Sequence, residues 1–89
     1  MTDDRAGNGA DLVLLVGISP LPPPVAGLLD SRPMVIFYGE GVNHPWNGEE
    51  NLFYLLQDVE GRGRSPFSQC LTDEECVERL LKARKVLTF

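Results

Sequence analysis

Uninterrupted apolar runs occur twice in the first half of the chain. The first is Leu12–Val16, which ends at Gly17, and the second spans residues 34–38, followed by a glycine-containing turn at 39–41. Short runs in which every residue is apolar are typical of strands buried on both faces, as in a parallel sheet covered by helices. The pattern therefore predicts two buried strands.

The segment between these strands is rich in proline. Proline fixes φ and removes a backbone donor, so residues 19–24 cannot form a central strand. Pro24 suits the first position of a helix, and residues 25–30 therefore predict one or two helical turns.

Apolar residues recur with a helical period in the middle of the chain. Asn47 is a suitable N-cap, and Glu50 follows three residues later, which approximates a capping box. The positions that would share one apolar face are Leu52, Leu55, Leu56 and Val59. Because Gly61 can end a helix, we expect a helix between Asn47 and Gly61.

The last quarter of the chain carries the clearest local signal. Thr72 and Glu75 form a T-x-x-E capping box, which predicts that a helix starts there. Its expected apolar face consists of Cys76, Val77, Leu80 and Leu81. Residues 65–71 before the helix are a polar strand candidate, and residues 86–89 after it can form a last short strand.

The predicted elements alternate strictly between strand and helix, beginning and ending with a strand. Such alternation is typical of an α/β fold, here a small three-layer sandwich with a mostly parallel sheet of about four short strands flanked by helices. We expect residues 11–89 to form this single domain and the polar residues 1–10 to form a flexible tail. A chain of 89 residues builds only a small core, which oligomerisation would supplement.

Composition and charge exclude several classes of function. The net charge of −5 leaves no basic surface for nucleic acid or for an anionic membrane. The longest apolar run is too short to span a bilayer, and the acidic N-terminus is unlike a signal peptide, so we expect a cytoplasmic protein. The two cysteines, Cys70 and Cys76, are read as free thiols in a reducing compartment.

Three predicted loops follow the carboxyl ends of strands, where reactive groups lie in open α/β sheets. The loops at 17–24, 39–46 and 69–72 should converge on one edge if the sheet is parallel. The side chains they supply are Ser19, Tyr38, Glu40, Asn43, His44, Trp46 and Cys70.

Cys70 is the strongest candidate for chemistry. It lies two residues before the presumed N-cap Thr72, where unpaired amides and the helix dipole would favour the nucleophilic thiolate. The acids of the first helical turn oppose this effect, and a small buried hydrophobic residue is the alternative interpretation. The residues that could support Cys70 are Tyr38, Glu40, His44 and Thr72.

The remaining candidates are better explained structurally. Cys76 falls on the apolar helix face and is expected in the core. His44 could act as a base, but a loop histidine before Pro45 is the simpler interpretation. His44, Cys70 and Cys76 lack the spacing of a zinc site, so we expect no metal. No phosphate-binding loop or nucleophile elbow is present in the sequence.

The sequence VIFYGEGV at 35–42 resembles the second-strand signature of the DsrE/DsrF-like family, which includes the TusD sulfur-relay proteins. Cys70 is similarly placed to the family's sulfur-carrying cysteine, after the third strand and before a helix. Residues 85–89 resemble the closing strand of the family, and the proline-containing loop after the first strand is similar in kind. The chain departs from the family in its shorter length, its shortened first helix and its polar third strand.

The resemblance implies a persulfide carrier or thiol transferase in which Cys70 is the sulfur acceptor. It also implies sulfur donor and acceptor proteins as partners, homo- or hetero-oligomers, and no metal or organic cofactor. The alternative is a non-catalytic protein–protein interaction module, such as an accessory subunit that keeps the fold without the activity. The cysteine before a capped helix favours the carrier, whereas the shortened first helix and the polar third strand favour the module.

Overall fold

A computed structural model describes residues 11–89 of the protein; the tail expected at residues 1–10 lies outside the described residues. The strands are β1 (Leu12–Val16), β2 (Met34–Phe37), β3 (Leu52–Leu55), β4 (Cys70–Leu71) and β5 (Lys85–Thr88). The helices are α1 (Pro23–Leu28), α2 (Leu56–Gly61) and α3 (Asp73–Lys82), with short 3-10 helices η1 (Leu29–Ser31) and η2 (Gly39–Asn43).

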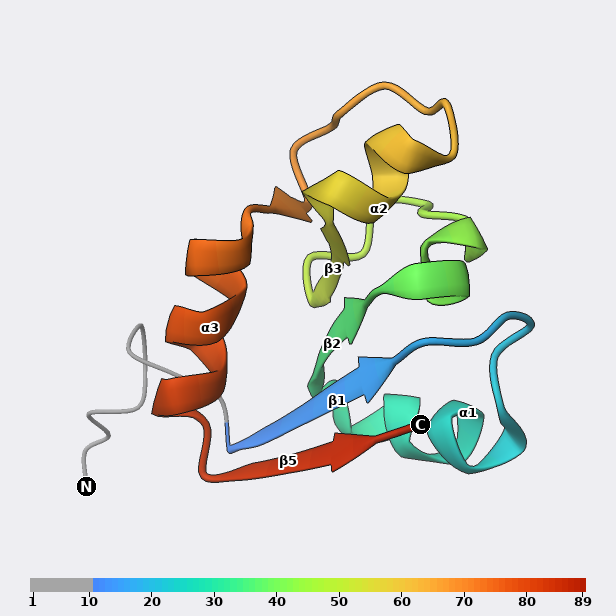
Figure 1. The fold of residues 1–89 in the computed structure, drawn as a ribbon. Coiled ribbons are helices and arrows are strands. Elements are labelled where there is room, and N and C mark those ends of the chain that lie inside the picture. The colour runs from blue at the N-terminus through green and yellow to red at the C-terminus, as the bar shows by residue number, and fades with distance from the viewer. Residues whose placement is uncertain (1–10) are drawn as a thin grey trace.

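The five strands form one parallel sheet in the order β4-β3-β2-β1-β5 (Figure 1). The chain moves stepwise from β1 to β4, and α3 then carries it back so that β5 pairs with the other side of β1. The predicted fold class, a small α/β sandwich with a mostly parallel sheet, is confirmed. The sheet contains one strand more than expected.

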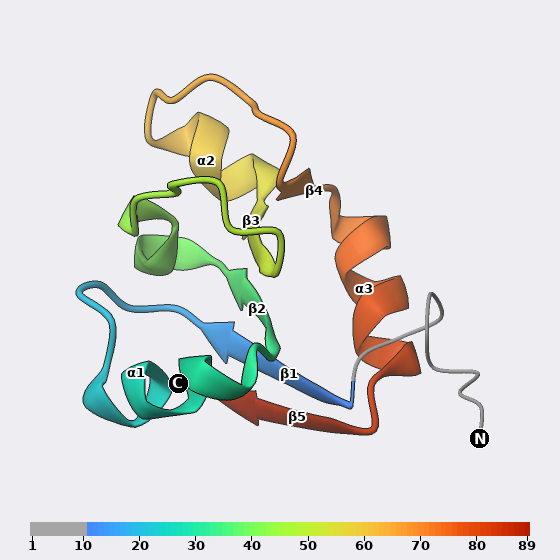
Figure 2. The same ribbon diagram turned by 180° about the vertical axis from the view of Figure 1, so that it is seen from behind.

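Helices cover both faces of the sheet (Figures 1 and 2). Val25 of α1 and Val59 of α2 belong to the larger core cluster, which also contains Phe37 and Tyr54. Cys76 and Leu80 of α3 pack on the opposite cluster, Val13, Ile36 and Leu71. Because neighbouring residues of a strand point to opposite faces, the apolar runs of β1 and β2 supply side chains to both clusters.

The prediction of a helix from Asn47 to Gly61 is wrong in its first part. Leu52–Leu55 forms strand β3, in which burial alternates, and only α2 is helical. Pairing with β2 buries Leu52 and Tyr54 against the larger core cluster, and this tertiary gain exceeds a helical preference that aromatic residues hold only weakly. The expected capping box is absent, since the Glu49 carboxylate instead accepts from the Asn47 amide.

Helix α3 starts as predicted but packs by a narrower face. Thr72 and Glu75 form the complete capping box. Cys76 and Leu80 contact the sheet, whereas Val77 is 53% and Leu81 80% exposed, which contradicts the four-residue apolar face. Each of these two lies one residue, about 100° of helical rotation, beyond the contacting stripe, so it turns away from the sheet.

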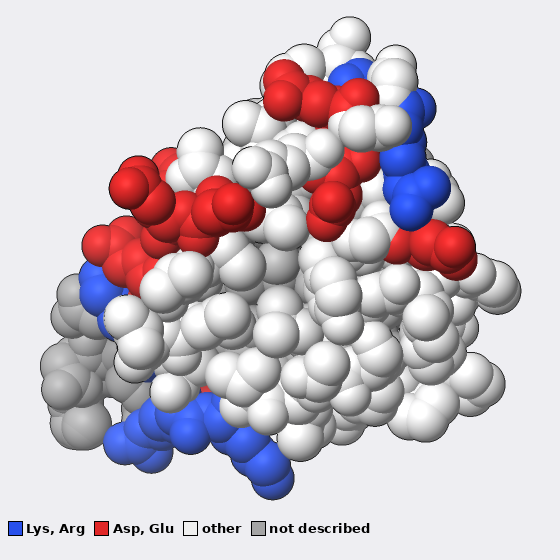
Figure 3. All heavy atoms as spheres, viewed as in Figure 1, with Lys and Arg blue, Asp and Glu red and all other residues white. Residues whose placement is uncertain are grey.

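Acidic and basic side chains form several groups on the face shown in Figure 3. Acidic side chains lie over α3 and over the α2 region at the top, and basic side chains lie near the start of β5 at the bottom and at the upper right. The first turn of α3 contributes Asp73, Glu74 and Glu75, and its last turn contributes Arg79 and Lys82. Within residues 11–89, no helix has the length and apolar character needed to cross a membrane.

Candidate functional site

Cys70 begins the short edge strand β4 and is half-buried. Its backbone lies directly opposite Tyr54 of β3, and its side chain packs against the same core cluster as Tyr54. The other long side of β4 has no strand partner among the described residues. The thiol is therefore neither free on the surface nor enclosed in the core.

The expected support from the amides of α3 is not formed. Leu71 packs with Cys76 and Leu80 beneath α3, so Cys70, one residue earlier, faces the opposite side of the sheet. The amide of Glu75 is already bonded to the Thr72 hydroxyl at 3.1 Å. Thr72 thus acts as a helix cap, and the prediction that helix amides face the Cys70 thiol is wrong because it ignored strand alternation.

Rings from two loops and two strands gather on the face to which Cys70 points. Phe37 stacks on His44 at 4.8 Å between ring centroids and contacts Tyr54 at 5.0 Å. Phe67 meets the Tyr54 ring edge-on at 5.2 Å and stacks with Trp46 at 5.4 Å. We call these five residues, Phe37, His44, Trp46, Tyr54 and Phe67, the aromatic cluster.

Hydrogen bonds hold the two loops over the aromatic cluster. The Arg64 guanidinium donates to the Val42 carbonyl and lies 5.5 Å from the centre of the Phe67 ring. The Trp46 indole donates to the Glu49 carbonyl at 2.7 Å, and the Gln69 amide donates to the Leu52 carbonyl at 2.7 Å. The Arg64 and Gln69 bonds join segments far apart in the sequence, the Trp46 bond is local, and together they fix the surroundings of Tyr54 and Cys70.

Tyr38 and Glu40 lie away from Cys70. The ring of Tyr38 covers Gly17 at the end of β1, since a Cβ added to Gly17 would lie 2.6 Å from the Tyr38 Cζ atom. Glu40 is exposed within η2. Since β2 and β4 are two strand spacings apart, about 10 Å, the structure does not bring these side chains to the thiol.

His44 is held by packing. Burial lowers the pKa of its imidazole, and the nearby Glu49 carboxylate opposes this shift. The imidazole is therefore more often neutral than that of a free histidine at the same pH, and the neutral form suits its stacking on the Phe37 ring. It reaches Cys70 only indirectly, through Phe37 and Tyr54 of the aromatic cluster.

Cys76 occupies the core position that the helical pattern predicts. It is half-buried on the side of α3 that faces the sheet, and burial together with the Asp73 carboxylate raises the pKa of its thiol. Because Cys70 and Cys76 face opposite sides of the sheet, they are not placed to form a disulfide, and both are free.

The chain matches none of the protein-family models, curated proteins or solved structures with which it was compared. The resemblance to the DsrE/DsrF-like family therefore stays an expectation. A functional role must accordingly be inferred from the geometry around Cys70, on the edge strand and beside the aromatic cluster.

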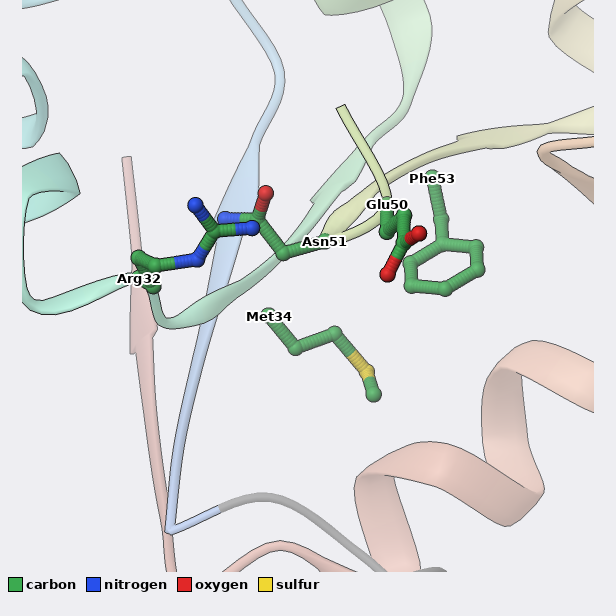
Figure 4. A pocket seen from close by; sticks show the side chains of 5 residues that line it. All are labelled: Arg32, Met34, Glu50, Asn51 and Phe53. Atoms are coloured by element: carbon green, nitrogen blue, oxygen red, sulfur yellow. The ribbon is translucent and has the colours of Figure 1, made fainter. Parts of the chain in front are cut away.

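Sequence reasoning missed two features of the structure. One is Tyr54, which was placed on a predicted helix and thus not among the site residues. The other is an open hollow of about 330 Å³ at the amino ends of β2 and β3, lined by Arg32, Met34, Glu50, Asn51 and Phe53 (Figure 4). Its residues come from separate segments, so no local motif marks it. Residues 11–89 contain no cluster of three His, Cys, Asp or Glu side chains placed to hold a metal ion.

Proposed function

We propose that this protein transfers sulfur through Cys70, as a persulfide carrier or thiol transferase. The observation that carries the proposal is the position of Cys70, half-buried on an edge strand with one long side unpaired among the described residues. A partner thiol can approach from that side, which is the access that thiol exchange requires. Cys76 is also half-buried, but it lies on α3 and packs against Val13, Ile36 and Leu71 on the other face of the sheet, away from this edge.

The reaction is a transfer of sulfane sulfur without net oxidation. The Cys70 thiolate attacks the outer sulfur of a donor persulfide, R–S–SH, and a new S–S bond forms on Cys70. The donor S–S bond breaks, and its electron pair leaves with the donor as the thiolate R–S⁻. An acceptor thiolate then takes the same sulfur from Cys70 in the equivalent step.

Sulfur transfer of this kind needs partner proteins and a reducing compartment. Donor and acceptor are proteins bearing persulfide and thiol groups, the compartment is the reducing cytoplasm, and no cofactor takes part. Homo- or hetero-oligomers would cover apolar surface that the small domain leaves exposed.

A second candidate, a non-catalytic accessory subunit, is favoured by the outer face of α3. Val77 and Leu81 are the most exposed large apolar residues of that helix, and Asp73, Glu74 and Glu78 surround them. An apolar strip with an acidic rim suits a protein partner whose own rim is basic. The absence of helix amides around Cys70 also favours this candidate, since it removes one means of stabilising a thiolate.

Intact mass spectrometry after incubation with glutathione persulfide separates the two candidates. For the carrier we expect wild type to gain the mass of one sulfur atom, Cys70→Ser to gain none, and Cys76→Ala to behave like wild type. No adduct on any of the three proteins would contradict the carrier and support the accessory subunit. Loss of the adduct in Cys76→Ala alone, with the fold preserved, would contradict the assignment to Cys70.

A further inference from the structure

The hydroxyl of Tyr54 is a buried donor without an acceptor. The residue is 0% exposed, and among residues 11–89 its hydroxyl has no hydrogen-bond partner. Burying a polar group in this way costs free energy, so an unpaired hydroxyl at a fixed position needs an explanation. Phenylalanine would fill the same space without that cost.

The surroundings of this hydroxyl connect it with Cys70. Tyr54 and Cys70 are direct partners in the register of β3 and β4, and both side chains lie on the same face of the sheet. The Tyr54 phenol also interacts electrostatically with Glu49, Arg64 and Cys70. The unpaired donor therefore lies in the region that the Cys70 sulfur borders.

Tyr54 stays protonated over the physiological range. Burial is the main cause that raises the pKa of its phenol, and Glu49 and Cys70 raise it further against the opposing effect of Arg64. A phenol that keeps its proton acts as a hydrogen-bond donor, and the group it lacks is an acceptor.

We propose that the Tyr54 hydroxyl donates a hydrogen bond to the sulfane sulfur when Cys70 carries a persulfide. This inference rests on the proposed function, and it identifies Tyr54 as the residue that binds the sulfur carried on Cys70. The bare thiol sulfur makes no hydrogen bond with Tyr54, but a second sulfur extends the side chain by about 2 Å, the length of an S–S bond. The terminal sulfur anion is an acceptor, and bonds to charged acceptors are stronger than those between neutral groups.

The aromatic cluster explains why the donor is kept rigid. Phe37 and Phe67 contact the Tyr54 ring from different sides, at 5.0 and 5.2 Å between centroids. The hydroxyl is thus held in place before sulfur arrives, so little reorganisation is needed on loading.

The test compares Tyr54→Phe with its parent protein, both in a Cys76→Ala background so that only Cys70 reacts. Each protein is loaded with glutathione persulfide, and alkylation of the loaded sulfur by iodoacetamide is followed by mass spectrometry from acid to alkaline pH. Because the hydrogen bond favours the anion, we expect the midpoint of this profile to rise by about one pH unit or more in Tyr54→Phe. Tyr38→Phe, which removes a phenol distant from Cys70, should leave the midpoint unchanged.

The outcomes separate the inference from the proposed function. If the parent protein takes up no sulfur, the proposed function fails and the inference fails with it. If it loads and the midpoints of parent and Tyr54→Phe coincide, the inference is overturned while the carrier stands. Unloaded Tyr54→Phe should be at least as stable as its parent, and a clear loss of melting temperature would show that the hydroxyl is already bonded without sulfur, which also overturns the inference.

Discussion

Gly41 lies where two backbone segments approach each other closely. A Cβ atom placed on it would lie 2.1 Å from the Val16 carbonyl oxygen, a distance that no real Cβ contact reaches. The contact joins η2 to the end of β1, so the turn after β2 depends on the missing side chain. Gly27 of α1 has open space instead, because a Cβ atom placed on it would have no atom from beyond its own helix within 4 Å.

Gly41→Ala and Gly27→Ala form a matched pair with opposite expected signs. We expect Gly41→Ala to lower the free energy of unfolding by roughly 1–3 kcal/mol, since backbone atoms must move to admit the methyl group. Gly27→Ala should raise it by about 0.5–1 kcal/mol, since alanine favours a helix and restricts the unfolded chain. Urea denaturation measures both, and equal effects of the two changes would contradict the close approach at Gly41.

At the scale of elements, α3 is held by a complete N-terminal cap and by a narrow packing face. None of its residues is fully buried, and its contacts with the sheet come mainly from Cys76 and Leu80. Its first turn is fixed by reciprocal bonds, in which the Glu75 amide donates to the Thr72 hydroxyl and the Thr72 amide donates to the Glu75 carboxylate. The Arg79 guanidinium, 4.7 Å from the centre of the Phe53 ring, adds a contact further along the helix.

Removing the cap should therefore have a measurable effect. We expect Thr72→Ala to cost about 1 kcal/mol of unfolding free energy, because it leaves a helix amide without its acceptor. Thr72→Ser keeps the hydroxyl and should remain close to wild type. Denaturant titration followed by far-UV circular dichroism measures the difference, and similar losses in both variants would show that the methyl group, not the hydroxyl, is what α3 needs.

At the scale of the whole molecule, stability should decrease from the centre of the sheet to its edges. β1 is paired on both sides, and Val13, Leu14 and Val16 within it are fully buried. β5 pairs with β1 alone among the described strands, and three of its four residues are exposed. β4 has only two residues, so the strand that carries Cys70 has few bonds to hold it.

Hydrogen exchange followed by NMR tests this order. We expect the bonded amides of β1 to exchange at least about tenfold more slowly than those of β5, because an edge strand opens without global unfolding. The difference follows from the sheet order, because β1 is paired on both sides whereas β5 has one side without a strand partner among the described residues. Protection of β5 equal to that of β1 would mean that another segment or another copy covers this edge.

Local sequence determined those elements whose signals lie within a few residues. The apolar runs at β1 and β2 and the Thr72 capping box appear as predicted, and the helical turns predicted at residues 25–30 appear as α1 and η1, starting at Pro23. The parallel α/β class followed from their alternation. These features depend on backbone preferences and side-chain period, which a short segment contains in full.

Only the tertiary structure decided which face each residue uses and which segment pairs with which strand. Leu52–Leu55 forms β3 because it pairs with β2 and buries side chains in the core. Tyr54 therefore lies on a strand, in register with Cys70, and not on the predicted helix. The same alternation turned Cys70 away from α3. A shift of one residue along a strand reverses the face of every side chain, so the surroundings of the thiol depend on long-range pairing.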